Sequence, residues 1–173
     1  MSSSGRRLFA LDQGFPQNIL EALRASVREA ELVWIGKIDP ALSTVEDWEL
    51  LLRLSRHDRP WDGLITTDDS MLNLPKEMVV LHQTRLTLVV TESAGHDPVT
   101  ATGLLLAHLP HICKETDRTK AQVWCLRTHR KPAEDPWVYL NSWAKRNREN
   151  PNNVYQRYRL RDEELGGQGQ KPG

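Results

Sequence analysis

The sequence predicts an α/β fold, a three-layer α/β/α sandwich in which helices cover both faces of a mostly parallel sheet. Short apolar and β-branched stretches alternate with segments of helical periodicity up to about residue 127. Such alternation is typical of parallel sheets with helices on both faces. Beyond residue 127 the sequence becomes basic and aromatic, which indicates an additional C-terminal segment.

The expected elements are short and follow one another closely. We expect strands at residues 8–11, 32–35, 63–66, 78–81, 86–90 and 122–126. We expect helices at 16–30, 44–57 and 98–109, one helical turn at 70–74, and a further helix near 137–148. Ser43 and Glu46 match a capping box at the start of the second helix. Asp97 and Pro98 mark a helix start, and Pro110 is expected to end that helix.

The composition is that of an ordinary soluble domain. The chain has 173 residues, of which 39% are hydrophobic and 27% are charged. No apolar run approaches membrane-spanning length, and the apolar run near the N-terminus is too short for a secretion signal. The two cysteines, Cys113 and Cys125, do not suggest a disulfide framework, so we expect a cytoplasmic protein.

The chain divides into three parts by composition. We expect an α/β domain at 7–127, a basic and aromatic extension at 128–163, and a disordered Gly/Gln/Pro-rich tail at 164–173. Residues 1–113 carry 10 Lys/Arg and 15 Asp/Glu, whereas residues 114–173 carry 13 and 8. The extension is expected to contact RNA, with Arg130, Lys131, Lys145, Arg146 and Arg157 gripping phosphates. Alternatively, it covers the sheet edge or holds a partner protein.

Acidic residues follow two of the predicted strands and begin a helix between them. Asp12 follows the first strand, Asp68 follows the strand at 63–66, and Asp47 lies in the first turn of helix 44–57. Glu46 is the alternative acid in that turn, and Asp69 adjoins Asp68. Carboxylates gathered at one sheet edge suit Mg²⁺ or Mn²⁺, which lower the pKa of a bound water. The simpler interpretation is that Asp68 or Asp69 caps the next helix.

A zinc site is the weaker alternative for metal binding. His108, His111, Cys113 and Cys125 are the available ligands, but Pro110 interrupts their spacing. The cysteines are more simply explained as small buried residues.

The order of these motifs resembles that of the PIN-like domains related to VapC-type toxins. The opening strand with its acid is matched by Leu8-Phe9-Ala10-Leu11-Asp12, and the helix that follows is matched by Phe15-Pro16-Gln17-Asn18-Ile19-Leu20. The mid-chain acid is matched by Glu46-Asp47-Trp48, and the Thr-x-Asp signature by Thr66-Thr67-Asp68. The resemblance covers about residues 7–127.

This resemblance implies a metal-dependent ribonuclease, often the toxin of a toxin–antitoxin pair. Asp12, Asp47 and Asp68 would bind Mg²⁺ or Mn²⁺, and Thr66 would orient a carboxylate or a water. A cognate antitoxin protein and a second copy of the chain would be its partners. Ser70 stands where the family often has another acid, and Asp69 is the candidate substitute.

Three functions therefore follow from the sequence. The first is an endoribonuclease that depends on Mg²⁺ or Mn²⁺. The second is a non-catalytic module that binds nucleic acid or protein and has a weakened metal site, which Ser70 and the zero net charge favour. The third is a phosphatase or receiver-like protein, because acids at strand exits also serve phosphoryl transfer.

Overall fold

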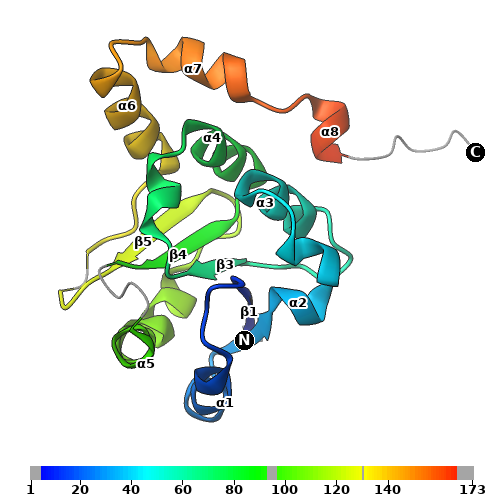
Figure 1. The fold of residues 1–173 in the computed structure, drawn as a ribbon, viewed down its shortest axis with the longest axis vertical. Coiled ribbons are helices and arrows are strands. Elements are labelled where there is room, and N and C mark those ends of the chain that lie inside the picture. Colours follow the sequence, from blue (N-terminus) through cyan, green and yellow to red (C-terminus); the bar gives the residue numbers. More distant parts are fainter. Residues whose placement is uncertain (1–4, 93–96, 130, 167–173) are drawn as a thin grey trace, which may run out of the picture.

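A parallel sheet forms the centre of the molecule, as the sequence predicts. The computed structural model describes residues 5–92, 97–129 and 131–166. The described residues form a five-stranded sheet in the order β2-β1-β3-β4-β5, with all neighbouring strands parallel (Figure 1). The strands are β1 (Arg7–Leu11), β2 (Ala30–Trp34), β3 (Gly63–Thr66), β4 (Thr87–Thr91) and β5 (Gln122–Leu126).

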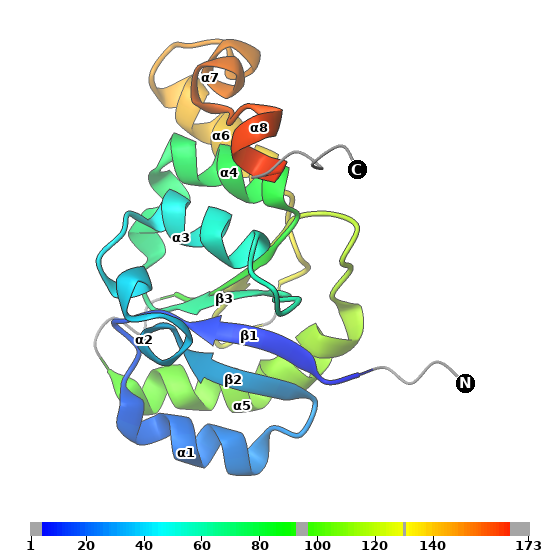
Figure 2. The same ribbon diagram turned by 90° about the vertical axis from the view of Figure 1, so that its right-hand side faces the viewer.

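Helices cover both faces of the sheet. The helices are α1 (Gln17–Ser26), α2 (Ile35–Ile38), α3 (Asp47–Ser55), α4 (Pro75–Thr84), α5 (Pro98–Glu115), α6 (Pro136–Arg146), α7 (Pro151–Tyr158) and α8 (Asp162–Gly166), with 3₁₀ turns η1 (Pro40–Ser43) and η2 (Asp69–Asn73). In both views α1 and α5 lie on one face, and α3 and α4 lie on the other (Figures 1 and 2). The three-layer α/β/α architecture is therefore confirmed.

Both faces of the strands are buried, so their sequences are almost continuously apolar. In β1, Phe9 and Leu11 belong to the core cluster on the α1 and α5 side. Leu8 and Ala10 belong to the cluster on the α3 and α4 side. This period of two is the normal alternation of side chains along a strand.

The predicted strand at 78–81 is wrong, because these residues form the middle of α4. Met78, Val80 and Leu81 pack in the core against the sheet, whereas Val79 packs against the C-terminal helices. A helix that is covered on two sides needs apolar residues around most of its circumference. Its sequence is then a short continuous apolar run, which periodicity alone does not distinguish from a strand. Pro75 occupies the first position of this helix.

Three other local predictions also need correction. The capping box at Ser43 and Glu46 does not form, because Ser43 ends η1 and α3 begins only at Asp47. Pro110 does not end its helix, and α5 continues to Glu115. Pro110 leaves the carbonyl of Leu106 without its usual donor, and Leu106 lies on the exposed side of the helix at 40% exposure. Helix α1 ends at Ser26 rather than near residue 30.

The C-terminal extension packs mainly on α4. Leu140, Ala144 and Val154 form a small cluster around Val79, and α6 and α7 lie beside α4 in both views (Figures 1 and 2). An isolated antiparallel bridge between Val123 and Glu134 lies along the edge strand β5. The expected disordered tail begins inside α8, which extends to Gly166, and residues 167–173 lie outside the described residues.

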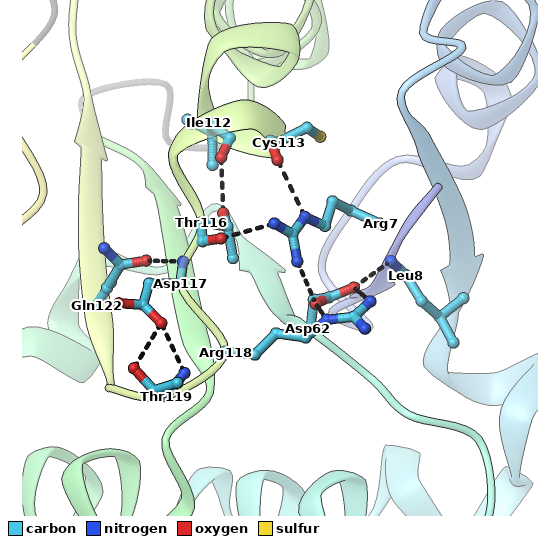
Figure 3. Close-up of polar contacts among 10 residues, drawn as sticks. All are labelled: Arg7, Leu8, Asp62, Ile112, Cys113, Thr116, Asp117, Arg118, Thr119 and Gln122. Atoms are coloured by element: carbon cyan, nitrogen blue, oxygen red, sulfur yellow. Dashed lines mark hydrogen bonds and ion pairs between the residues drawn. The ribbon is translucent and has the colours of Figure 1, made fainter. Parts of the chain in front are cut away.

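Buried Asp62 joins the strands at the amino-terminal edge of the sheet (Figure 3). Its side chain is fully buried and accepts hydrogen bonds from the Leu8 N–H at 2.8 Å and from Arg7 at 3.3 Å. Arg118 binds both oxygens of the same carboxylate. Arg7 also donates to the carbonyls of Cys113, at 3.0 Å, and Thr116, at 2.7 Å. This network connects β1, the segment before β3 and the connection from α5 to β5.

Within the described residues, no helix combines the length and the apolar character needed to cross a bilayer.

Replacing Asp62 with Ala should destabilise the fold by about 3 kcal/mol, because it leaves Arg7 and the Leu8 N–H without their buried acceptor. Urea unfolding of the wild type and the variant measures this loss. Asp58→Ala, an exposed acid on the same loop, should change the free energy of unfolding by less than about 0.5 kcal/mol. A loss below about 1 kcal/mol for the Asp62 variant would contradict this role.

Candidate functional site

Asp12 and Asp68 lie at the carboxyl edge of the sheet because β1 and β3 are parallel neighbours. Leu11 stands opposite Ile65 in the register of the two strands. The Asp12 N–H continues the pairing by donating to the Ile65 carbonyl at 3.0 Å. Both acids therefore leave the sheet at the same edge, where ligands bind in open α/β sheets.

The hydroxyl of Thr66 connects the two acidic residues. It donates to the Asp12 carboxylate at 2.8 Å and accepts from the Asp68 N–H at 3.0 Å. Thr66 is fully buried at 0% exposure, so this hydroxyl cannot turn to water instead. The other oxygen of Asp12 accepts from the Gln13 N–H at 2.6 Å. The Asp12 carboxylate is thus held in one orientation.

Asp47 brings a third carboxylate to this edge from the first turn of α3. Burial raises its pKa above the usual value, and the charges of Asp12, Asp68 and Glu46 raise it further. A charged group shifts the pKa of another group strongly only when the two lie close together, so Asp12 and Asp68 are near neighbours of Asp47. None of the carboxylates of Asp12, Asp47 and Asp68 forms an ion pair with a described residue.

Glu77 is an acidic residue of this site that the sequence analysis missed. It lies in the first turn of α4 and is only 8% exposed. Burial raises its pKa most, and Asp47 and Glu46 add to the rise, while its own backbone N–H and Lys76 oppose it. The sequence signal was an acid two residues after Pro75, in the first turn of a helix. The incorrect strand at 78–81 concealed that signal.

The alternative acids behave differently from one another. Glu46 is exposed at the N-cap of α3, where it accepts from the indole N–H of Trp48, and it acts electrostatically on both Asp47 and Glu77. Asp69 is exposed at the start of η2 and is not among the charges that raise the pKa of Asp47. The Ser70 N–H donates to Asp68 at 2.9 Å, so Asp68 does cap this short turn.

The neighbouring half of the same edge is neutralised. Glu92 follows β4 and pairs with Arg127, which follows β5. The hydrogen bond from Arg127 lowers the pKa of Glu92. By contrast, the acids that follow β1 and β3 form no ion pair with any described residue.

The donor set suits a hard divalent cation, because it consists of carboxylate and hydroxyl oxygens. The negative charges of buried Glu77 and half-buried Asp47 also repel each other, and a bound cation would relieve this repulsion. Within the described residues, no three His, Cys, Asp or Glu side chains are arranged closely enough to hold a metal ion. The acids are therefore neighbours without forming a closed coordination shell.

The sheet separates the two cysteines of the zinc alternative. Cys113 belongs to the core cluster on the α5 side and Cys125 to the cluster on the opposite face. Cys125 contacts the hydroxyl of Tyr139, and His108 contacts the carbonyl of Arg127. Cys113 and Cys125 therefore do not belong to one zinc site, and both are buried free thiols.

The predicted RNA-binding cations that the structure describes come from α6, α7 and the segment before α6. Arg146, in the last turn of α6, donates to the side chain of Asn73 in η2 at 3.0 Å, which brings it to the turn that follows Asp68. Lys145 is exposed on the same helix. Arg157 on α7 pairs with Glu149, which lies between α6 and α7. Lys131 precedes α6, and its charge helps to lower the pKa of Glu92. Arg130 lies outside the described residues.

Comparison of the chain with protein-family models, curated proteins and solved structures finds no match. The assignment of a function must therefore come from the residues of the site.

Removing the charge of Asp47 or Glu77 should stabilise the fold at neutral pH. Both pKa values are raised in the folded protein, so ionisation disfavours folding. The penalty is absent below the usual pKa values of 3.8 and 4.5, grows as the pH rises from these values to the raised ones, and is complete above them. Asp47→Asn and Glu77→Gln should each raise the Tm at pH 7, by roughly 2–4 °C for each kcal/mol of relieved repulsion.

Thermal unfolding of the wild type and the two variants between pH 4 and pH 8 measures the increase in Tm. This increase should become smaller as the pH falls. Asp69→Asn, which removes an exposed acid outside the group, is the control and should leave the Tm unchanged. A lower Tm at pH 7 for both variants would show that these carboxylates are stabilised rather than strained.

Proposed function

We propose that this protein is a metal-dependent nuclease that cleaves RNA phosphodiester bonds with the acids at the carboxyl edge of its sheet. The observation that carries the proposal is the Thr66 hydroxyl, which joins the Asp12 carboxylate to the backbone of Asp68 at the carboxyl edge of two adjacent parallel strands. Burial raises the pKa of half-buried Asp47, and the charges of Asp12 and Asp68 raise it further. These three acids come from the ends of β1 and β3 and the start of α3. They also match the acidic motifs of the PIN-like resemblance, in the same order along the chain.

A divalent cation is the natural partner of this group. Clustered carboxylates without an ion pair need a proton or a cation, and oxygen donors favour Mg²⁺ or Mn²⁺ over zinc. Asp12, Asp47 and Asp68 would hold the ion only together with water molecules or a phosphate oxygen of the RNA, because these carboxylates alone are not arranged closely enough to do so. Glu77 would be a further acid beside them. When bound, the ion supplies positive charge that activates a water and stabilises the charge developing on a phosphodiester.

The protein's own side chains prepare the site for this role. Thr66 and the Gln13 N–H fix the two oxygens of Asp12, and such supporting contacts orient the ligands of metal sites. Arg146, next to η2, supplies a cation that attracts phosphate groups toward an otherwise acidic edge. A role as the toxin of a toxin–antitoxin pair, with an antitoxin partner and a homodimer, is proposed from the resemblance alone.

A non-catalytic binding module is the second candidate. It is favoured by the hydrogen bonds that Asp12 and Asp68 already make within the protein. It is also favoured by Ser70, which stands where the family often has another acid and whose N–H is capped by Asp68. Such a module would bind RNA equally well with EDTA and would cleave nothing with any divalent ion.

Cleavage of a labelled RNA with Mn²⁺ or Mg²⁺ tests the first proposal. Asp12→Asn and Asp68→Asn should each lower the rate by about 100-fold or more, because the metal supplies several kcal/mol of charge stabilisation. Thr66→Val should lower it by about 10- to 100-fold, because it releases the Asp12 carboxylate. Asp69→Asn is the matched control, and circular dichroism should show that every variant keeps the fold.

Undiminished cleavage by both the Asp12 and Asp68 variants would show that any activity arises elsewhere. Absence of cleavage by the wild type with every divalent ion would favour the binding module.

A further inference from the structure

A tryptophan and a lysine form a contact beside the acids, and the proposed chemistry does not use them. The ammonium of Lys76 lies 3.5 Å from the centre of the Trp48 ring. Trp48 follows Asp47 in the first turn of α3, and Lys76 precedes Glu77 in the first turn of α4. Both side chains are partly exposed. An aromatic face and a cation therefore stand at the rim of the acidic site.

The ring of Trp48 is held more firmly than the lysine that covers it. The indole N–H donates to the Glu46 carboxylate, and the ring packs against the core cluster beneath it. Lys76 forms no ion pair with a described residue, and its charge acts on nearby Glu77. A lysine side chain is long and flexible. It can leave the ring face at small cost, whereas the indole stays in place.

The electrostatics of the site explain why such a rim is needed. The acids would repel an approaching RNA phosphate unless cations stand close by. Lys76 on α4 and Arg146, which reaches Asn73 from α6, are the cations that the structure brings to this rim. Proteins that hold single nucleic-acid strands combine such cations with aromatic rings on which bases stack.

We propose that Trp48 and Lys76 form a platform that positions the RNA strand at the acidic edge. An unpaired base stacks on the indole in place of the lysine, and the displaced ammonium binds an adjacent phosphate. Stacking of a base on an aromatic ring is stronger than an exposed cation–π contact, so the exchange favours binding. Trp48 and Lys76 are positioning residues, and this inference rests on the proposed nuclease function for its biological purpose.

The platform requires a base that is free to leave its neighbours. A base inside a duplex is already stacked and paired, and its ring faces are not accessible. The contribution of Trp48 to binding is therefore expected for an unpaired strand and not for the same strand within a duplex.

Fluorescence anisotropy tests the platform with a labelled 12-nucleotide oligouridylate, alone and paired with its oligoadenylate complement, in EDTA so that no cleavage occurs. Trp48→Leu should weaken binding of the single strand by about 5- to 150-fold, the usual contribution of one stacked base. Trp48→Phe, which keeps an aromatic face, should recover most of that affinity. Duplex binding should be the same for all three proteins.

The lysine is tested through the salt dependence of binding. Lys76→Gln should reduce the slope of the logarithm of affinity against the logarithm of salt concentration by about 0.7 for the single strand, because one phosphate contact is lost. Lys114→Gln, which replaces an exposed lysine on α5, and Trp143→Leu, which replaces a partly buried tryptophan in the C-terminal cluster, are the matched controls. Thermal unfolding should confirm that Trp48→Leu and Trp48→Phe are equally folded.

An affinity of Trp48→Leu equal to that of Trp143→Leu would overturn the proposal, as would an equal loss for single strand and duplex. The cleavage assay separates this result from the nuclease proposal. Stacking on Trp48 in a protein that cleaves no RNA would leave the platform standing without the nuclease. Cleavage that depends on Asp68, with binding indifferent to Trp48, would leave the nuclease without the platform.

Discussion

The pairing of β1 with β3 is the constraint on which the site depends. Leu11 and Ile65 stand opposite each other, and the Asp12 N–H extends the ladder beyond the strand. Because the two strands are parallel, their acids emerge together, and the Thr66 hydroxyl links Asp12 to the backbone of Asp68. Helices α3 and α4 then begin at the same edge and add Asp47 and Glu77.

The two edges of the sheet treat acidic side chains in opposite ways. At the amino-terminal edge, Asp62 is fully buried and is neutralised by two arginines and a backbone N–H. At the carboxyl edge, burial raises the pKa values of Asp47 and Glu77, and the charges of neighbouring acids raise them further. The first arrangement stabilises the fold, whereas the second disfavours it unless a proton or cation is bound. Carboxylates with pKa values perturbed in this way are typical of functional sites.

The sequence predicted the architecture and the acidic positions better than the local boundaries. Alternation of strands and helices indicated the parallel sheet, and strand-end acids indicated Asp12 and Asp68, because both signals are short-range. It failed at α4, where an apolar run between two packed surfaces imitates a strand, and therefore missed Glu77. The separation of Cys113 from Cys125 by the sheet depends on tertiary topology, which spacing along the chain does not reveal.

The central claim is that these neighbouring carboxylates bind a divalent cation. Calorimetric titration of Mn²⁺ into the wild type and Asp68→Asn tests it most directly, with and without a non-cleavable RNA analogue. The account predicts saturable binding to the wild type that the variant loses. Absence of saturable binding to the wild type in both conditions, or binding of equal strength to the variant, would contradict it.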